Sequence, residues 1–255
     1  RIDVNYILEL FNVKPVKISG NATGRLTLAH AFDSLKVEAK GLDVPNFAFN
    51  DAYIGHGKVD GSFSMKDKRL WLHGDIQEKG IGYTLIDGYV GIGEKSIDLK
   101  IRNKNTNLAF LNKYISTIFG DLQGRATGHC RVHGEFTSID FEGDEDGEAT
   151  AKILVTNVPY TVKDGKVKMS AGCFDFSGFK VYDGLGGEGV LSGYLKHNHL
   201  KDLSYDIQVQ AKDMLFYDRS RELDMPFYAT AGGTGKVHIY GRPGELIVDA
   251  QARPH

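Results

Sequence analysis

Hydrophobic and polar residues alternate along most of the chain with a period of two. This is the pattern of β-strands that have one apolar and one polar face. The clearest run extends from Leu203 to Ala211, where every second residue is apolar and each residue between is polar. Similar runs occupy residues 35–39, 97–101, 167–169, 174–176 and 246–250. We therefore predict an all-β fold of short antiparallel strands.

Four Asp-Gly pairs lie between or within these runs, at residues 60–61, 87–88, 164–165 and 183–184. Both residue types tolerate a positive φ, which the tightest hairpin turns require. The pattern therefore predicts a tight turn at each of the four pairs.

Two stretches have helical periodicity instead. Residues 4–11 and 107–119 each place their apolar side chains on one helical face, and Gly120 follows the second stretch as a stop signal. The first stretch is well under the ~12–15 residues that an isolated helix needs, and the second barely reaches that length. We predict two short helices that cap the sheet and form no domain of their own.

A long repeat organises the chain. Residues 20–28, 124–132 and 233–241 share a glycine-rich opening followed by the same alternation, and Gly24, Gly128 and Gly235 are separated by 104 and 107 positions. The apolar positions Leu26, Cys130 and Val237 fall in one phase of the three copies. A period this long indicates modules of several strands. We predict one module over residues 1–119 and a second over 120–255, continuous in one elongated sheet.

A sheet with one apolar face has to cover that face with a helix, a second sheet or a closed barrel. Two short helices are too few, so the sheet either folds as a sandwich or curls around an apolar interior. Glycines at the start of each repeat favour strongly bent strands. The side chains that we expect to point inward are Leu26, Leu28, Val37, Leu99, Cys130, Val132, Val155, Phe174, Phe176, Ile207, Val209, Val237 and Ile239.

Composition narrows the functional classes. The chain of 255 residues has a net charge of −2, and its Lys and Arg residues are dispersed, which argues against nucleic-acid binding. No apolar run reaches the roughly 18 residues of a spanning helix. The alternation is already under way at Arg1 and still in progress at His255, which favours a segment of a longer protein. Cys130 and Cys173 either pair or remain thiols in the core, and the second reading is the simpler one.

Three local patterns invite a metal-binding interpretation. His129 and His133 are four residues apart on a predicted strand, roughly 13 Å, which is too far for two ligands of one ion. Residues 142–148 are acidic but lack the spacing of a calcium loop. His197 and His199 need a third ligand from elsewhere. We expect no metal, no cofactor and no catalytic residue, and hence no enzyme.

An ordered series of short motifs from about Gly120 to the end resembles the TamB family of Gram-negative bacteria, particularly its Bacteroidetes type. The series comprises residues 124–128, 158–167, 179–183, 189–195, 205–207, 214–218 and the third repeat copy. Residues 1–119 resemble a more divergent repeat of the same kind. The chain thus resembles the C-terminal region of such proteins, within the wider AsmA-like and bridge-like lipid-transfer superfamily.

The resemblance implies a curled sheet, or β-taco, that forms an open trough with an apolar interior. It also implies a role in outer-membrane biogenesis: moving phospholipid across the periplasm, or helping to insert outer-membrane proteins. The location would be the periplasm, with an inner-membrane anchor in a segment outside this sequence. The partners would be phospholipid acyl chains and, through other regions, an outer-membrane barrel protein. The inward side chains named above would then line a lipid groove.

Two other classes stay open at this point. A closed β-sandwich, as in adhesins or carbohydrate-binding modules, would have the same alternation with a fully packed core. A β-solenoid enzyme is disfavoured, because such solenoids repeat every 20–30 residues and the spacing here is about 104. The sequence separates the lipid conduit from the closed sandwich poorly, because both need the same apolar face.

Overall fold

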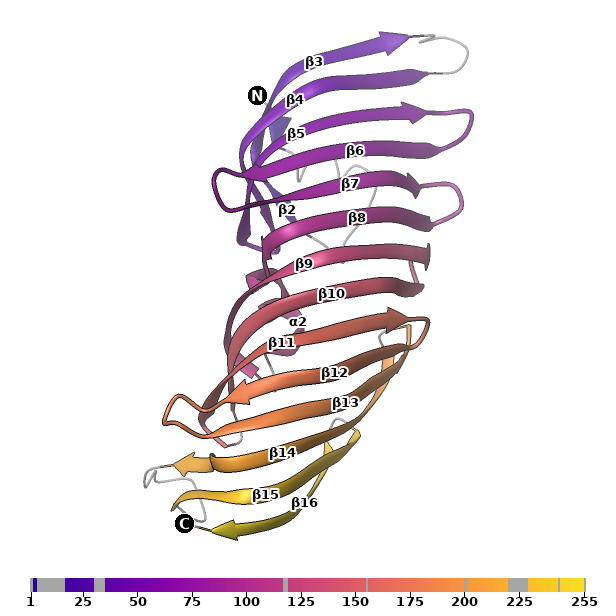
Figure 1. Cartoon of the computed structure of the whole chain (residues 1–255). Helices are drawn as coiled ribbons and strands as arrows, with labels where there is room; N and C mark the ends of the chain where they lie inside the picture. The colour runs from indigo at the N-terminus through magenta and orange to yellow at the C-terminus, as the bar shows by residue number, and fades with distance from the viewer. Residues whose placement is uncertain are drawn as a thin grey trace. The chain divides into compact units, whose positions relative to one another are not determined.

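The computed structural model describes residues 2–3, 17–29, 35–116, 119–154, 156–199, 201–219, 229–242 and 244–254. The described residues form one sixteen-stranded sheet whose order follows the chain, with β2 paired off the main path (Figure 1). Neighbouring strands are antiparallel wherever their register is defined, and the two end strands of the path, β1 and β16, are not neighbours. The predicted all-β class with an open antiparallel sheet is confirmed.

The strands of the first half are β1 (Ile2–Asp3), β2 (Ile18–Ser19), β3 (Asn21–Ala29), β4 (Lys36–Phe49), β5 (Ala52–Ser64), β6 (Arg69–Glu78), β7 (Gly82–Gly91) and β8 (Ser96–Asn107). Those of the second half are β9 (Phe119–Glu135), β10 (Ser138–Ile153), β11 (Val158–Ser170), β12 (Cys173–Tyr182), β13 (Glu188–Asn198), β14 (Lys201–Arg219), β15 (Ala229–Arg242) and β16 (Glu245–Pro254).

The chain divides into two compact units. Unit 1 contains Arg1–Phe110 and Ala126–Gly143, and unit 2 contains Leu111–Arg125 and Asp144–His255. The sequence placed a single boundary between residues 119 and 120, whereas β9 and β10 each contribute residues to both units. The three repeat copies lie on β3, β9 and β15, and the copy on β9 spans the boundary between the units, so the copies do not open separate domains.

The helical expectations are met only in part. A 3-10 turn, η1 (Ala109–Leu111), leads into a one-turn helix, α2 (Asn112–Ile115), so the helix predicted over 107–119 is much shorter. The side chain of Asn112 explains why the chain turns back: it accepts a hydrogen bond from the backbone N–H of Leu122 at 3.0 Å and donates one to the Leu122 carbonyl at 2.9 Å. Phe119 already belongs to β9. The helix predicted over residues 4–11 lies outside the described residues.

Three of the four turns predicted at Asp-Gly pairs are wrong. The pairs at residues 60–61, 87–88 and 164–165 lie inside β5, β7 and β11, and only the pair at 183–184 lies between strands. At Asp60 and at Asp87 the strand continues through the Asp-Gly pair without a turn. Asp164, with φ 57°, and Gly178, with φ 65°, lie between the paired residues Lys163–Lys180 and Lys166–Ser177. The register of β12 with β13 shifts at the same place, so the left-handed residues there form a bulge in a continuing hairpin. The turn from β4 to β5 instead uses Asn50 and Asp51, both with positive φ.

The register of unit 1 carries its apolar side chains onto one face, which we call the apolar face. Residues directly opposite on antiparallel strands point to the same side, so each row of partners stays on one face. One row contains Leu28, Val37, Phe63, Leu70, Val90 and Ile97, and the next contains Leu26, Ala39, Gly61, Leu72, Gly88 and Leu99. The other side, the polar face, carries the intervening polar residues.

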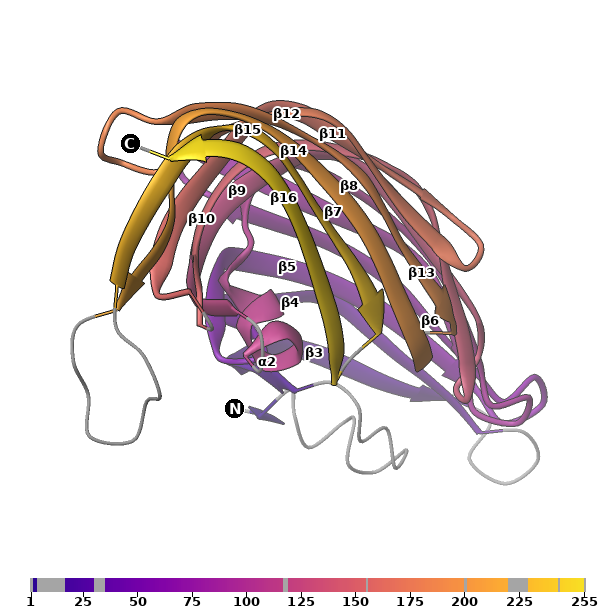
Figure 2. The same cartoon turned by 90° about the horizontal axis from the view of Figure 1, so that it is seen from below.

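The core of unit 1 occupies only part of this apolar face. Its buried residues are Ala22, Leu42, Val44, Phe47, Ile54 and Ile76. Phe110, just after β8, packs against them and makes an edge-on ring contact with Phe49 at 5.4 Å. Figure 2 shows the strands of unit 1 as bent ribbons. Phe110 therefore covers part of the apolar face of this unit.

Unit 2 repeats the arrangement. One row of its register contains Phe176, Gly193, Ile207, Ile239 and Val248, and the next contains Leu191, Val209, Val237 and Ala250. The buried core is small and consists of Val181, Ala211 and Met214, with half-buried neighbours such as Tyr160 and Phe216. The bulge at Asp164 and Gly178 shifts the alternation by one residue, which keeps apolar side chains on the same face along β11 and β12.

Candidate functional site

The inward residues predicted in unit 1 lie on its apolar face, but they differ in how far their side chains are buried. Val37 and Leu99 are half-buried. Leu26 and Leu28 are 48% and 68% exposed, and among the described residues β3 has a partner on its outer side only at Asn21 and Ala22. These two leucines thus lie at the rim of the described part of the face, and their place in a lipid groove stays a prediction.

Cys130 and Val132 follow the same phase on β9. Between them Arg131 donates two hydrogen bonds of 2.9 Å to the carboxylate of Asp98, which lies on the polar face of unit 1. Strand alternation then places Cys130 and Val132 on the opposite, apolar side, where both are half-buried. The burial of Asp98 is offset by the Arg131 guanidinium, whose hydrogen bond holds the pKa of that carboxyl below its usual range.

In unit 2 the predicted residues share one face. Phe174, Phe176, Ile207, Val209 and Ile239 are half-buried, and Val237 is buried. Val155 lies outside the described residues. The ring of His197 stacks on Phe174 with a centroid distance of 4.7 Å, so one end of this face ends on a buried histidine.

The apolar faces are covered by very little of the described chain. All described strands belong to one sheet, and the described helical segments span only Ala109–Ile115. In unit 1, Leu70, Leu72, Ile97 and Ile101 stay half-buried beyond the patch that Phe110 covers. A closed sandwich would bury such residues under a second sheet, and the described residues provide none.

The apolar face of unit 1 has a polar boundary at one end. Thr84 and Thr106 share a hydroxyl hydrogen bond of 2.6 Å, and the amide of Asn103 donates to the Ala126 carbonyl at 3.0 Å. Both Thr84 and Asn103 are buried. These hydrogen bonds lower the desolvation cost of placing polar side chains at the end of the apolar face.

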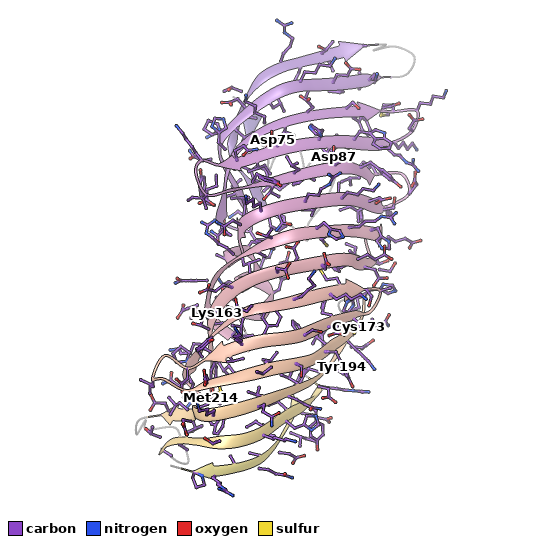
Figure 3. All side chains as sticks on the ribbon, in the orientation of Figure 1. Asp75, Asp87, Lys163, Cys173, Tyr194 and Met214 are labelled. Carbon is purple, nitrogen blue, oxygen red and sulfur yellow. The ribbon has the colours of Figure 1, made fainter. Side chains whose placement is uncertain are left out.

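Two hollows of the described structure lie on the polar faces. In unit 1 a hollow of about 690 Å³ crosses β4 to β8 between two rows of side chains. One wall contains Glu38, Ser62, Trp71, Tyr89 and Asp98, and the other contains Asp60, His73, Asp87 and Lys100. Figure 3 labels Asp87 on β7 and its neighbour Asp75 on β6. The floor is the main chain around Gly61 and Gly88.

Unit 2 has a smaller hollow of about 390 Å³ between the row of Ser192, Gln208, His238 and Asp249 and the row of Val190, Gln210, Lys236 and Gln251. Sequence reasoning assigned no role to either hollow. Alternation alone puts Trp71, His73, Asp87 and Tyr89 on polar faces, but it leaves the pairing of β6 with β7 unknown. The register, which the sequence does not state, is what brings these four residues together.

The metal interpretations gain nothing from the structure. In the described part of the chain, no three His, Cys, Asp or Glu side chains gather as metal ligands would. Within the acidic stretch, Asp144 and Asp146 form ion pairs with Lys166 at 3.0 and 3.9 Å. No disulfide joins Cys130 and Cys173 in the described structure. Among the described residues, no helix has the length and apolar character needed to cross a bilayer.

Comparison with known proteins identifies no relative of this chain. A scan against protein-family models finds no match, and neither a search of curated proteins nor one of solved structures finds a significant one. The TamB resemblance therefore rests on the ordered motifs alone and remains a hypothesis.

Proposed function

We propose that this chain is a segment of a lipid conduit that shields phospholipid acyl chains with its apolar face. The observation that carries the proposal is the incomplete cover of that face in each unit. Its half-buried side chains run from strand to strand in register, as in the row that joins Phe176, Ile207 and Ile239 through Gly193. A face of this kind needs an apolar partner, and the described residues supply only a partial one.

The energetic advantage to a lipid is large. A 14-carbon chain exposed to water costs about 0.8 kcal/mol per CH₂, or roughly 11 kcal/mol in all. Apolar contacts repeated along a sheet offset most of that cost at every position, and no position binds one lipid tightly. The proposed role needs contact and exclusion of water only, so we propose no catalytic group, metal or cofactor.

The TamB resemblance supports a location and partners for this role. We propose that the chain acts in the periplasm in outer-membrane biogenesis, anchored to the inner membrane through a segment outside this sequence. An outer-membrane barrel protein would be reached through other regions of the same protein. The closed-sandwich adhesin or carbohydrate-binding module falls behind, because the described strands form one sheet and not two facing ones.

Native mass spectrometry of the chain purified from Gram-negative cells tests the proposal. We expect populations carrying phospholipid, lost when the protein is unfolded and delipidated, and restored when refolded protein is mixed with phospholipid. The lipid should also protect the apolar side chains of β14, but not its polar ones, from hydroxyl-radical labelling. Protein that stays free of lipid before and after mixing would contradict the proposal.

A further inference from the structure

The polar face of unit 1 carries an exposed aromatic pair that the sheet itself does not require. Trp71 is the only tryptophan in the chain, and it is 47% exposed. Its ring lies 5.0 Å from that of Tyr89, tilted by 54°, and the guanidinium of Arg69 lies 4.4 Å from the Tyr89 ring centre. Tyr89 thus packs against the indole and is itself contacted by Arg69, while the exposed part of the indole forms an apolar surface along the wall of the hollow.

The facing wall supplies hydrogen-bonding groups. Nδ1 of His73 lies 2.5 Å from the carboxylate of Asp87, and this hydrogen bond raises the pKa of the imidazole. Asp60 accepts a hydrogen bond from the backbone N–H of Gly41 at 2.6 Å, which holds its carboxylate in place. Lys100 follows Asp87 in the same row. Fixed acceptors and a cation therefore stand across the main-chain floor from the indole.

We infer that this hollow binds a β-1,4-linked oligosaccharide, with one pyranose ring stacked on Trp71. A sugar ring has an apolar C–H face and a rim of hydroxyls, and these two properties match the two walls. The carboxylates of Glu38, Asp60, Asp87 and Asp98 line the hollow and disfavour nucleic acid or another polyphosphate. A lipid chain is disfavoured because it offers no hydrogen-bonding group to these carboxylates.

The dimensions favour a chain of sugars over a single one. The hollow crosses five neighbouring strands, β4 to β8, whose spacing of about 4.8 Å gives a length of roughly 19 Å. The two walls are straight cross-strand rows, so an extended, flat β-1,4-linked chain fits between them better than a bent one. The site lies on the face opposite the apolar one, and the inference is independent of the proposed lipid role.

The single tryptophan makes the test direct. The 255-residue chain is titrated with cellohexaose and with chitohexaose while indole fluorescence and calorimetric heat are recorded. We expect a saturable fluorescence change with at least one of the two β-1,4-linked probes. Trp71→Ala should weaken the calorimetric binding at least tenfold, and Asp87→Asn should weaken it as well. Trp71→Phe, which keeps an aromatic ring, should retain part of the affinity.

Tyr83→Ala is the matched control, because Tyr83 is an exposed aromatic residue on the polar side of β7 but outside the hollow. This variant should bind like the unaltered chain. The absence of a saturable response to both probes would overturn the inference. So would an equal loss of binding in Tyr83→Ala and Trp71→Ala. Circular dichroism of each variant confirms that the sheet is intact before binding is compared.

Discussion

Replacing Ile207 with aspartate is expected to reduce phospholipid binding at least tenfold. Ile207 is half-buried on the apolar face of unit 2, opposite Gly193 on β13 and Ile239 on β15. A carboxylate there has only apolar neighbours in its row, so a bound acyl chain would cover a charge without a partner, which costs more than ~1.4 kcal/mol. Binding of a fluorescent phosphatidylethanolamine to the purified chain measures the change. Gln208→Asp, one residue away on the polar face, should bind as the unaltered chain does.

A charge at Ile207 also weakens the packing of the sheet, so a second variant separates loss of lipid binding from loss of folding. Val248 lies in the same row on β16 and is 52% exposed, so Val248→Asp leaves the packing of the sheet almost unchanged. We expect Val248→Asp to keep its circular dichroism spectrum and to lose lipid affinity in the same direction. Two folded inward-charge variants that bind lipid as well as Gln208→Asp does would count against the conduit.

Replacing Asp183 with alanine is expected to destabilise unit 2 by about 3 kcal/mol, since hydrogen bonds to a charged acceptor contribute ~1.5–3 kcal/mol each and are not additive. Asp183 is 3% exposed and lies between β12 and β13. Its carboxylate accepts backbone N–H bonds from Leu185 at 2.8 Å, Gly187 at 2.9 Å and Leu215 at 2.7 Å. It therefore ties a glycine-rich loop to β14. Urea unfolding at pH 7 measures the loss, and Asp175→Ala, an exposed carboxylate on β12, should change stability little.

Asp183 also predicts a pH dependence. Burial by itself raises the pKa of this carboxyl, but the N–H groups of Leu215, Leu185 and Gly187 outweigh burial, and the pKa is lowered on balance. A lowered folded-state pKa means that this stabilisation is present above the unfolded value of about 4 and is lost as the pH falls through the folded value. Asp183→Ala should therefore flatten the acid limb of the stability profile. An unchanged acid limb would show that other carboxylates account for it.

The sequence predicts the strands and their faces well because alternation is a local property. Leu203 to Ala211 needs no knowledge of its neighbours to be read as a strand with one apolar side. Prediction from sequence fails where one residue pair suits two different backbone structures. Asp-Gly suits a tight turn, but at Asp164 it lies inside β11 with a left-handed backbone, and at Asp87 it continues a strand. Only the pairing with the next strand decides between these uses.

The helix predicted before β9 fails for a related reason. Residues 108–119 have the apolar period of a helix, but the side chain of Asn112 binds both backbone groups of Leu122. From Phe119 onward the chain is strand β9 of the sheet. Long-range pairing overrides a local helical pattern. The hollow beside Trp71 could not be predicted for the same reason. Its two walls come from five strands, and the sequence of a single strand does not determine its register with the next.

The most direct test of the account is a crosslinking scan of β14 in living cells. A photoreactive phenylalanine analogue is placed in turn at each position from Tyr205 to Gln210, and crosslinked phospholipid is identified by mass spectrometry. Because Tyr205, Ile207 and Val209 share the apolar face while Asp206, Gln208 and Gln210 lie on the polar face, the account predicts lipid crosslinks at every second residue. Crosslinks on neither face, or equally on both, would contradict it.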